Sequence, residues 1–143
     1  MQGRQEEAAE TFNKAIGINP EGISAMENLI DVLIARKSYL RALEMCDKIL
    51  SLSPDDVEAR VKLGIILAES GRIDESENVF KEALRLKPWS IEALRNLGAL
   101  YGNSGNFDKA ILVWEKILAI DPGNEKAKEA IERARQMKEG TGK

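Results

Sequence analysis

Histidine is absent from the 143-residue sequence, and cysteine occurs only once, as Cys46. Without histidine the chain cannot build a Ser-His-Asp or Cys-His catalytic centre, a histidine general base or a histidine metal site. A single cysteine can form neither an internal disulfide nor a thiolate metal cluster. We therefore expect no enzymatic activity, no metal and no cofactor. The unpaired cysteine fits a reducing compartment, so we expect a cytoplasmic protein.

Long apolar runs and an excess of basic residues are also lacking. No run approaches the roughly 20 apolar residues that span a bilayer, and the opening "MQGRQEEAAE" has no apolar core of a signal peptide. The net charge of −3 provides no basic face for nucleic acid. The sequence therefore predicts neither membrane insertion nor nucleic-acid binding, and its composition is typical of a soluble, ordered chain.

Proline is scarce, and its spacing is the strongest pattern in the chain. The four prolines follow one another at one constant interval, at Pro20, Pro54, Pro88 and Pro122. Each comes just after an apolar stretch with helical spacing, and proline cannot continue a helix. A fixed period of this length indicates a repeat array. The spacing therefore predicts an all-α chain of repeated helical units.

Written out in rows of one period each, the sequence shows two helical stretches per row, separated by a short polar break. In the first stretch, Ala8, Phe12, Ala15 and Ile16 recur at the spacing of one helical face. Gly71 and Gly105 stand one period apart at the breaks of the later rows, where a left-handed residue would close the first helix. We predict about eight helices, arranged mostly as hairpins.

The residues within the rows carry a family resemblance. The row from Ile91 to Asn124 contains Leu97-Gly98, Tyr101, Ala110 and Pro122. The chain thereby resembles the tetratricopeptide repeat, whose unit of roughly 34 residues follows W-x2-L-G-x2-Y, then A-x3-F, A and P. The resemblance implies a right-handed α-α superhelix, or solenoid, of stacked helix hairpins whose first helices line the concave side. It is weakest from Ile23 to Asp56, where Ile30 replaces the close-contact glycine.

The same register predicts how the chain is divided. We expect one array over residues 1–143. It begins with a half repeat at 3–22 that supplies only a second helix. Complete repeats follow at 23–56, 57–90 and 91–124, then a capping helix at 125–138 and a frayed tail at 139–143. Ala127, Ile131 and Ala134 give the capping helix one apolar face.

The resemblance also implies a peptide-binding groove lined by the first helices. The groove is acidic at its N-terminal end, apolar at Val61, Ile65 and Ala99, and more basic toward its other end. This gradient favours an extended or helical peptide with basic and apolar anchors toward the acidic end. Val61 and Ile65 argue most for binding, because an ordinary solvated face seldom carries two such residues at i and i+4. The predicted groove residues are Glu27, Asp31, Glu58, Val61, Lys62, Ile65, Arg95, Asn96, Ala99, Asn103, Lys126 and Arg133.

One class of family members grips acidic chaperone tails with a clamp of lysine, asparagine and arginine. On the three complete repeats the five clamp positions hold Glu27, Asp31, Lys62, Glu92 and Asn96. None matches and three are acidic, so we expect no such clamp. The leading functional hypothesis is a non-enzymatic protein–protein interaction scaffold that binds a peptide segment of a partner.

The first helix suggests a second hypothesis. Its apolar face, formed by Ala8, Phe12, Ala15 and Ile16, would lack the first helix of its own repeat. Either the chain is a piece of a longer array, or another chain covers this face and the array self-assembles. A regulatory segment of a larger protein is a further alternative.

Cys46 and Trp114 occupy aromatic positions of the repeat and are expected in the core. Trp89 either caps a junction or offers an exposed anchor.

Overall fold

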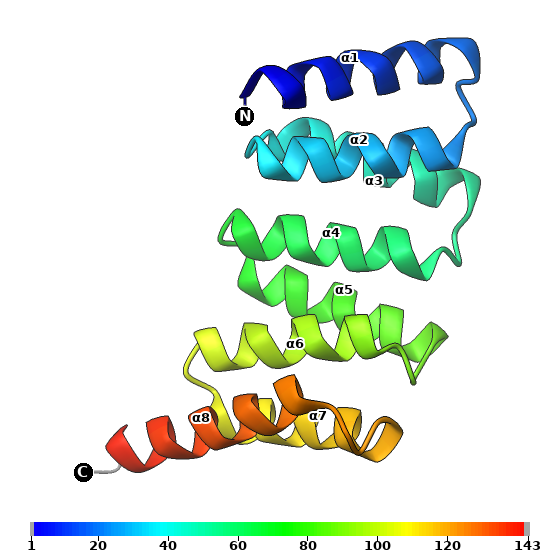
Figure 1. Ribbon diagram of the computed structural model, residues 1–143. Coiled ribbons are helices and arrows are strands. Elements are labelled where there is room, and N and C mark those ends of the chain that lie inside the picture. The colour runs from blue at the N-terminus through cyan, green and yellow to red at the C-terminus, as the bar shows by residue number, and fades with distance from the viewer. Residues whose placement is uncertain (1, 142–143) are drawn as a thin grey trace. The chain divides into compact units, whose positions relative to one another are not determined.

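The structure is a computed structural model that describes residues 2–141, and these residues form eight α-helices without any strand. The helices, labelled in Figure 1, fall into two compact units divided after Arg72. The first unit contains α1 (Gln2–Ile18), α2 (Ile23–Ala35), α3 (Tyr39–Leu52) and α4 (Val57–Glu69). The second contains α5 (Ile73–Leu86), α6 (Ile91–Asn103), α7 (Phe107–Ile120) and α8 (Glu125–Thr141). The predicted all-α composition and helix number are confirmed.

The prolines stop helices as predicted. α1, α3, α5 and α7 each end two residues before a proline. The residue two places after the proline then becomes the N-cap of the next helix. Asp56 accepts a hydrogen bond from the Ala59 amide at 2.9 Å, and Ser90 accepts one from the Ala93 amide at 3.2 Å. Each proline therefore ends one helix and sets the start of the next.

In the first unit, each helix packs on the next one along the chain, and α2 also contacts α4 (Figure 1). The core is made by Met26, Leu29, Ile30 and Leu33 of α2 together with residues of α3 and α4. Cys46 is fully buried in this core, as predicted, and desolvation by burial raises the pKa of its thiol to about 12. The cysteine is therefore a packing residue, since a reactive thiol needs exposure and a lowered pKa.

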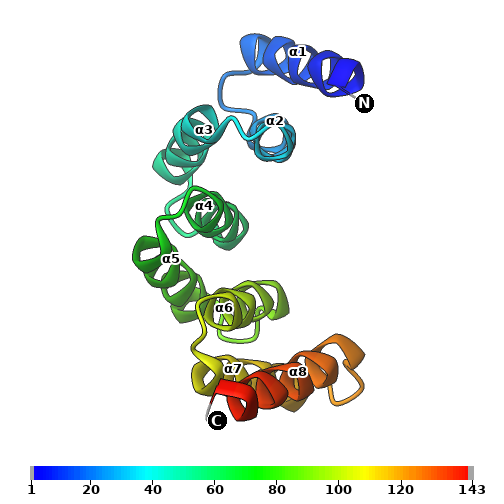
Figure 2. The same cartoon turned by 90° about the vertical axis from the view of Figure 1, so that its left-hand side faces the viewer.

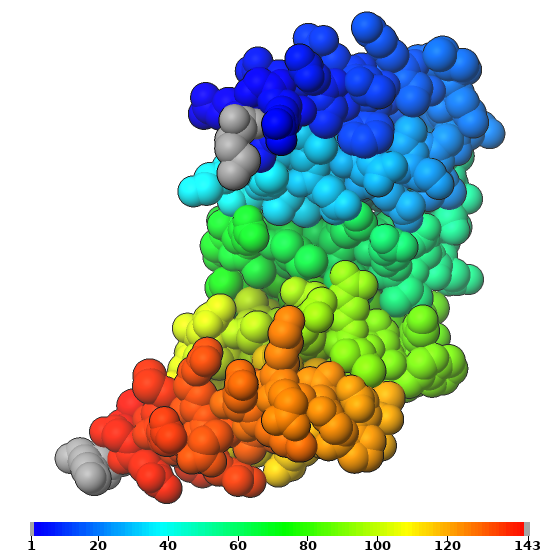
Figure 3. Space-filling model, viewed as in Figure 1, coloured from blue at the N-terminus to red at the C-terminus, as the bar shows by residue number. Residues whose placement is uncertain are grey.

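In the second unit, α6 packs on α5 and α7, and α7 packs on α8. Figure 2 shows α6 between α5 and α7, and in the space-filling view α8 lies across α7 (Figure 3). Trp114 of α7 is 8% exposed and belongs to the core, as predicted. The apolar face of α8 (Ala127, Ile131 and Ala134) is buried.

The last helix is longer than the sequence predicted. The tail was expected to fray from residue 139, but α8 continues to Thr141; residues 142 and 143 lie outside the described range. The Lys138 ammonium donates to Asp108 Oδ1 in the first turn of α7 at 2.6 Å, and the Thr141 hydroxyl donates to the Lys138 carbonyl at 3.0 Å. These contacts hold the final turn, and Lys138 also suits the negative end of the helix dipole.

The breaks inside the hairpins have the predicted backbone. Gly71 (φ 83°) and Gly105 (φ 78°) adopt the left-handed conformation, and Lys37 adopts it at the corresponding place with φ 58°. Glycine does this without steric cost, whereas lysine brings its Cβ close to the neighbouring carbonyl.

Replacing Lys37 with glycine should therefore stabilise the protein by about 0.5–1 kcal/mol. The measurement is urea unfolding followed by circular dichroism. Gly71→Ala provides the opposite control, since it should lose about 1 kcal/mol. An unchanged or lower midpoint for Lys37→Gly would show that the lysine side chain contributes more than its backbone strain costs.

Candidate functional site

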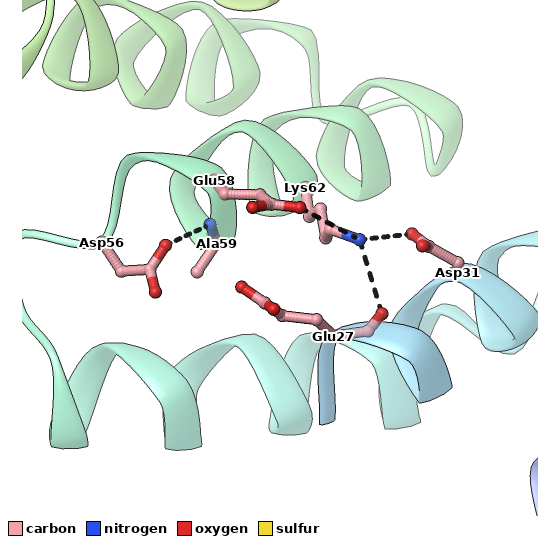
Figure 4. Close-up of polar contacts among 6 residues, drawn as sticks. All are labelled: Glu27, Asp31, Asp56, Glu58, Ala59 and Lys62. Carbon is pink, nitrogen blue, oxygen red and sulfur yellow. Dashed lines mark hydrogen bonds and ion pairs between the residues drawn. The ribbon is translucent and has the colours of Figure 1, made fainter. Parts of the chain in front are cut away.

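A cluster of carboxylates surrounds one lysine in the first unit (Figure 4). Lys62 of α4 donates from Nζ to Asp31 Oδ1 of α2 at 2.6 Å and to the backbone carbonyl of Glu27 at 3.4 Å. Glu58 Oε1 is 4.0 Å from the same nitrogen. We call Glu27, Asp31, Asp56 and Glu58 the acidic cluster. The carboxylates of Asp31 and Glu58 thus face the single ammonium, whereas the Asp56 carboxylate accepts from the Ala59 amide.

Within the acidic cluster, the surroundings of Glu27 disfavour its ionised form. Partial burial raises the pKa of this carboxyl above its ordinary value, and the neighbouring Glu58 and Asp56 raise it further. The Lys62 ammonium opposes this shift in pKa. The side chains of Asp31 and Glu58 are each 60% exposed, while that of Lys62 is 10% exposed. The buried Lys62 ammonium is therefore used for contacts within the protein, and the exposed carboxylates leave negative charge that can attract a cationic group.

Of the two apolar residues expected at the surface of the first unit, Val61 and Ile65, only Ile65 is accessible. Ile65 is half-buried, but Val61 is buried at 1% exposure. The prediction that Val61 offers an accessible contact is therefore wrong. α4 buries six residues spread around most of its circumference, so a residue on its inner positions meets neighbouring atoms instead of solvent.

A pocket lies between α6 and α8 in the second unit, where both helices pack on α7. Its volume is about 280 Å³. We call it the α6–α8 pocket. Helix α6 contributes Gly98, Ala99, Gly102 and Asn103, helix α7 contributes Phe107, Ala110 and Trp114, and helix α8 contributes Ala130, Arg133, Ala134 and Met137. The volume falls just below the roughly 300–1,000 Å³ of drug-sized ligand sites, so it suits a side chain.

Two glycines of α6 shape this pocket in different ways. A Cβ on Gly98 would lie 2.8 Å from Cε2 and Nε1 of Trp114, so the glycine lets the indole edge reach the helix backbone. A Cβ on Gly102 would have nothing within 4 Å. The first glycine is therefore needed for packing, whereas the second leaves open space.

The polar groups around the α6–α8 pocket are available to a ligand. Arg133 is exposed and makes no ion pair with any residue in the range 2–141, and within the same range neither the Asn103 amide nor the Trp114 indole N–H has a hydrogen-bond partner. A guanidinium, an amide and an indole N–H can together bind carbonyl or carboxylate oxygens.

The remaining predicted residues are placed as follows. Ala99, Asn103 and Arg133 meet at the pocket. Arg95 and Lys126 are exposed, while half-buried Asn96 donates its amide to the Glu92 carbonyl at 2.8 Å. Neither Arg95, Asn96 nor Lys126 lines the pocket. Phe107 and Trp114 were not predicted, because they lie on a second helix of a repeat and the groove was expected on first helices. The large Trp114 at a position usual for phenylalanine, paired with Gly98, was the available signal.

The predicted oligomer contact on α1 is less open than expected. Ala8, Phe12, Ala15 and Ile16 are half-buried, and Phe12 and Ile16 pack against the core that α1 shares with α2. The neighbouring helix therefore covers part of the face that was expected to be uncovered. The strongly exposed apolar residue of this helix is Ile18, at 87%.

Comparison with known proteins agrees with the repeat pattern. A family model described as "Tetratricopeptide repeat" matches residues 33–81 and 67–134, and a second model of the same description matches residues 2–21. The chain belongs to the tetratricopeptide repeat family. Tetratricopeptide repeat arrays are protein-interaction scaffolds that use extended binding surfaces.

Solved structures show the same fold. A thermophilic TPR protein of Thermus thermophilus is 20% identical with a TM-score of 0.86, over 94% of this chain and 75% of that chain. MamA is 24% identical with a TM-score of 0.80, over 96% of this chain and 80% of that chain. YrrB, described as a TPR protein with an unusual peptide-binding site, is 21% identical with a TM-score of 0.70, over 96% and 71%. The predicted solenoid fold class is thereby confirmed.

The search of curated proteins returns no match. Among residues 2–141, no helix of this tetratricopeptide repeat chain combines the length and the apolar character required to cross a membrane.

Glu27→Gln should raise the thermal midpoint at pH 7, because it removes a carboxylate that folding desolvates and places near Glu58 and Asp56. The pKa of Glu27 is raised on folding, so its ionised form costs stability above the folded pKa. That cost disappears below the ordinary value of 4.5. The two proteins should therefore converge in acid.

The check is thermal unfolding of Glu27→Gln and wild type at neutral and acidic pH. Glu44→Gln, on an exposed part of α3, is the matched control and should show little difference at either pH. A destabilised Glu27→Gln protein at pH 7 would mean that the ionised carboxylate makes a favourable contact that outweighs its desolvation.

Alanine at the two glycines of α6 should have opposite consequences. Gly102→Ala should gain about 1 kcal/mol from helix propensity, since its Cβ meets open space. Gly98→Ala should forfeit that gain, because displacing the Trp114 ring costs about 1–3 kcal/mol. Urea unfolding monitored by tryptophan fluorescence measures both effects. Equal stability of the two variants would contradict the packing role of Gly98.

Proposed function

We propose that this chain is a non-catalytic scaffold that binds a peptide segment of a partner protein and holds one of its apolar side chains in the α6–α8 pocket. The observation that carries the proposal is the pocket itself. It has small residues along α6, two aromatic rings from α7 and a cationic rim on α8. Concave apolar sites with a few convergent polar groups are the usual form of ligand sites in proteins.

The chemistry of the pocket defines the peptide. An apolar side chain would lie against Gly102 and Trp114 and be removed from water. Main-chain carbonyls or an acidic neighbour would then accept hydrogen bonds from Asn103 and Arg133. Burying one large apolar side chain is worth about 1.5–3 kcal/mol, which makes this the anchor of the interaction, and the polar groups fix its direction.

The acidic cluster of the first unit, taken by itself, offers a separate site for a cationic side chain. Its four carboxylates exceed the single Lys62 ammonium, and Asp31 and Glu58 remain exposed. A lysine or arginine of a partner would reduce the repulsion among these carboxylates, which adds to the effect of burial in raising the pKa of Glu27. Ile65 would add an apolar contact in the first unit, and Arg95, Asn96 and Lys126 would add polar contacts in the second. YrrB supports the general idea, because it is a protein of this fold whose description names a peptide-binding site.

Gly102→Leu should weaken binding of the peptide while leaving the fold intact. The new side chain starts in open space and should occupy the pocket, and leucine favours the helix over glycine by about 0.8 kcal/mol. We expect affinity to fall about tenfold or more, which corresponds to about 1.4 kcal/mol. The probe is the set of peptides selected from a random display library on the wild-type chain, and the readout is fluorescence anisotropy.

Ala119→Leu is the matched control, since it adds a leucine side chain at an exposed position of α7 outside the pocket. It should bind the selected peptides as the wild type does. Undiminished binding to Gly102→Leu would remove the pocket from the proposal. Loss of binding to both variants would point to a general effect on the fold.

Self-association through α1 is the second candidate function. Phe12 and Ile16 remain half-exposed, and Ile18 is 87% exposed on the same helix. Ile18→Lys should shift a concentration-dependent dimer toward monomer in light scattering, without loss of stability. A wild-type chain that stays monomeric at high concentration would exclude this candidate.

A further inference from the structure

A second groove lies on a different face of the second unit, between α5 and α7. It has a volume of about 440 Å³ and shares no residue with the α6–α8 pocket. Helix α6 lies between α5 and α7 (Figure 2). Its residues Leu97 and Tyr101 line the groove. We call it the α5–α7 groove.

The floor and walls of the α5–α7 groove are apolar. Leu97 and Tyr101 of α6 and Val113 of α7 lie at the bottom, with exposures of 4%, 6% and 6%. Leu84 of α5 is half-buried, and Leu112 of α7 is 59% exposed at the edge. The apolar surface is thus recessed, with one prominent leucine beside it.

The rim carries four cations. Lys81 and Arg85 come from α5, and Lys109 and Lys116 come from α7. Two carboxylates offset them in part. Glu82 pairs with Arg85 at 3.2 Å, and Glu77 accepts hydrogen bonds from Lys81 at 2.7 Å and from the Tyr101 hydroxyl at 2.8 Å.

The two remaining cations are less fully paired. Lys109 is 3.9 Å from Glu77 and lies 5.3 Å from the centroid of the Tyr101 ring. Lys116 forms no ion pair with any described residue. The rim therefore keeps an excess of positive charge, on a chain whose net charge is −3.

The preceding repeat does not carry this charge. One repeat earlier in the sequence, the four rim positions hold Asp47, Ser51, Glu75 and Glu82. The repeat pattern therefore does not require cations here, since the same register accepts three acids and a serine. Packing explains the apolar floor, but it leaves the basic rim unexplained.

We propose that the α5–α7 groove is a second interaction surface, which binds an acidic segment of a partner protein through one large apolar side chain flanked by carboxylates. The side chain enters between Leu84, Leu97 and Val113, and the carboxylates meet the basic rim. A bilayer fits less well, because it cannot reach a recessed floor, whereas a single side chain can. Charge complementarity of this kind also makes association depend on salt.

The test starts from Gly102→Leu, in which the α6–α8 pocket is filled, so that peptides held in the pocket do not contribute. A random-peptide display library is selected on this variant at low ionic strength. The expected peptides carry aspartate or glutamate on both sides of leucine, isoleucine or phenylalanine, and they bind less tightly as salt is added. Recovery of peptides without this pattern, or of no peptides, would overturn this proposal. Neither result would affect the proposed function of the α6–α8 pocket.

The selected peptides are then measured on Leu112→Ser/Lys116→Glu in the same background. Both positions are exposed, and the affinity should fall about tenfold or more. Leu40→Ser/Lys48→Glu repeats both changes at exposed positions of α3 and should bind normally. Equal affinity for the two double variants would overturn the proposal. A second result would also overturn it: the protein binds no acidic peptide but sediments with phosphatidylserine vesicles, and Leu112→Ser/Lys116→Glu abolishes that sedimentation.

Discussion

The helices in the middle of each unit bury their apolar residues because they have neighbours on two sides. Helix α2 shows the constraint most clearly, because Met26, Leu29, Ile30 and Leu33 are each buried to within 1% and need α1, α3 and α4 around them. Within each unit, stacking meets this need, with each helix packing mainly on the next. Helices two places apart in the second unit then face each other across the helix between them, and the recesses proposed to bind a partner lie between such helices.

The two recesses of the second unit follow from this geometry. Helices α6 and α8 both pack on α7 and enclose a pocket over Trp114, while α5 and α7 both pack on α6 and leave a groove over Leu97 and Tyr101. The repeat pattern fixes the apolar floors. The charged rims vary freely from one repeat to the next, so Arg133 borders the pocket, cations border the groove, and the acidic cluster of the first unit surrounds Lys62. A single fold can in this way present chemically different surfaces.

Much of the fold was predictable because proline and glycine act locally. The prolines ended helices, and Gly71 and Gly105 adopted the left-handed conformation that the register required. The length of α8 was not predictable, because Lys138 reaches Asp108, a residue 30 positions earlier in the sequence. Val61 was misjudged for a similar reason: repeat position suggested an open face, whereas burial depends on all the neighbours of α4. The candidate site was predicted only in part. Ala99, Asn103 and Arg133 were expected, but Phe107 and Trp114 belong to a helix that the sequence argument left aside.

The central claim is that a partner side chain lies against Trp114 in the α6–α8 pocket. The chain has two tryptophans, of which Trp89 is 62% exposed and Trp114 lines the pocket. Each indole N–H gives its own signal in a nitrogen–proton correlation spectrum. Titration with a selected peptide should shift the Trp114 signal and leave that of Trp89 in place. A Trp114 signal that stays fixed at saturation would contradict the account.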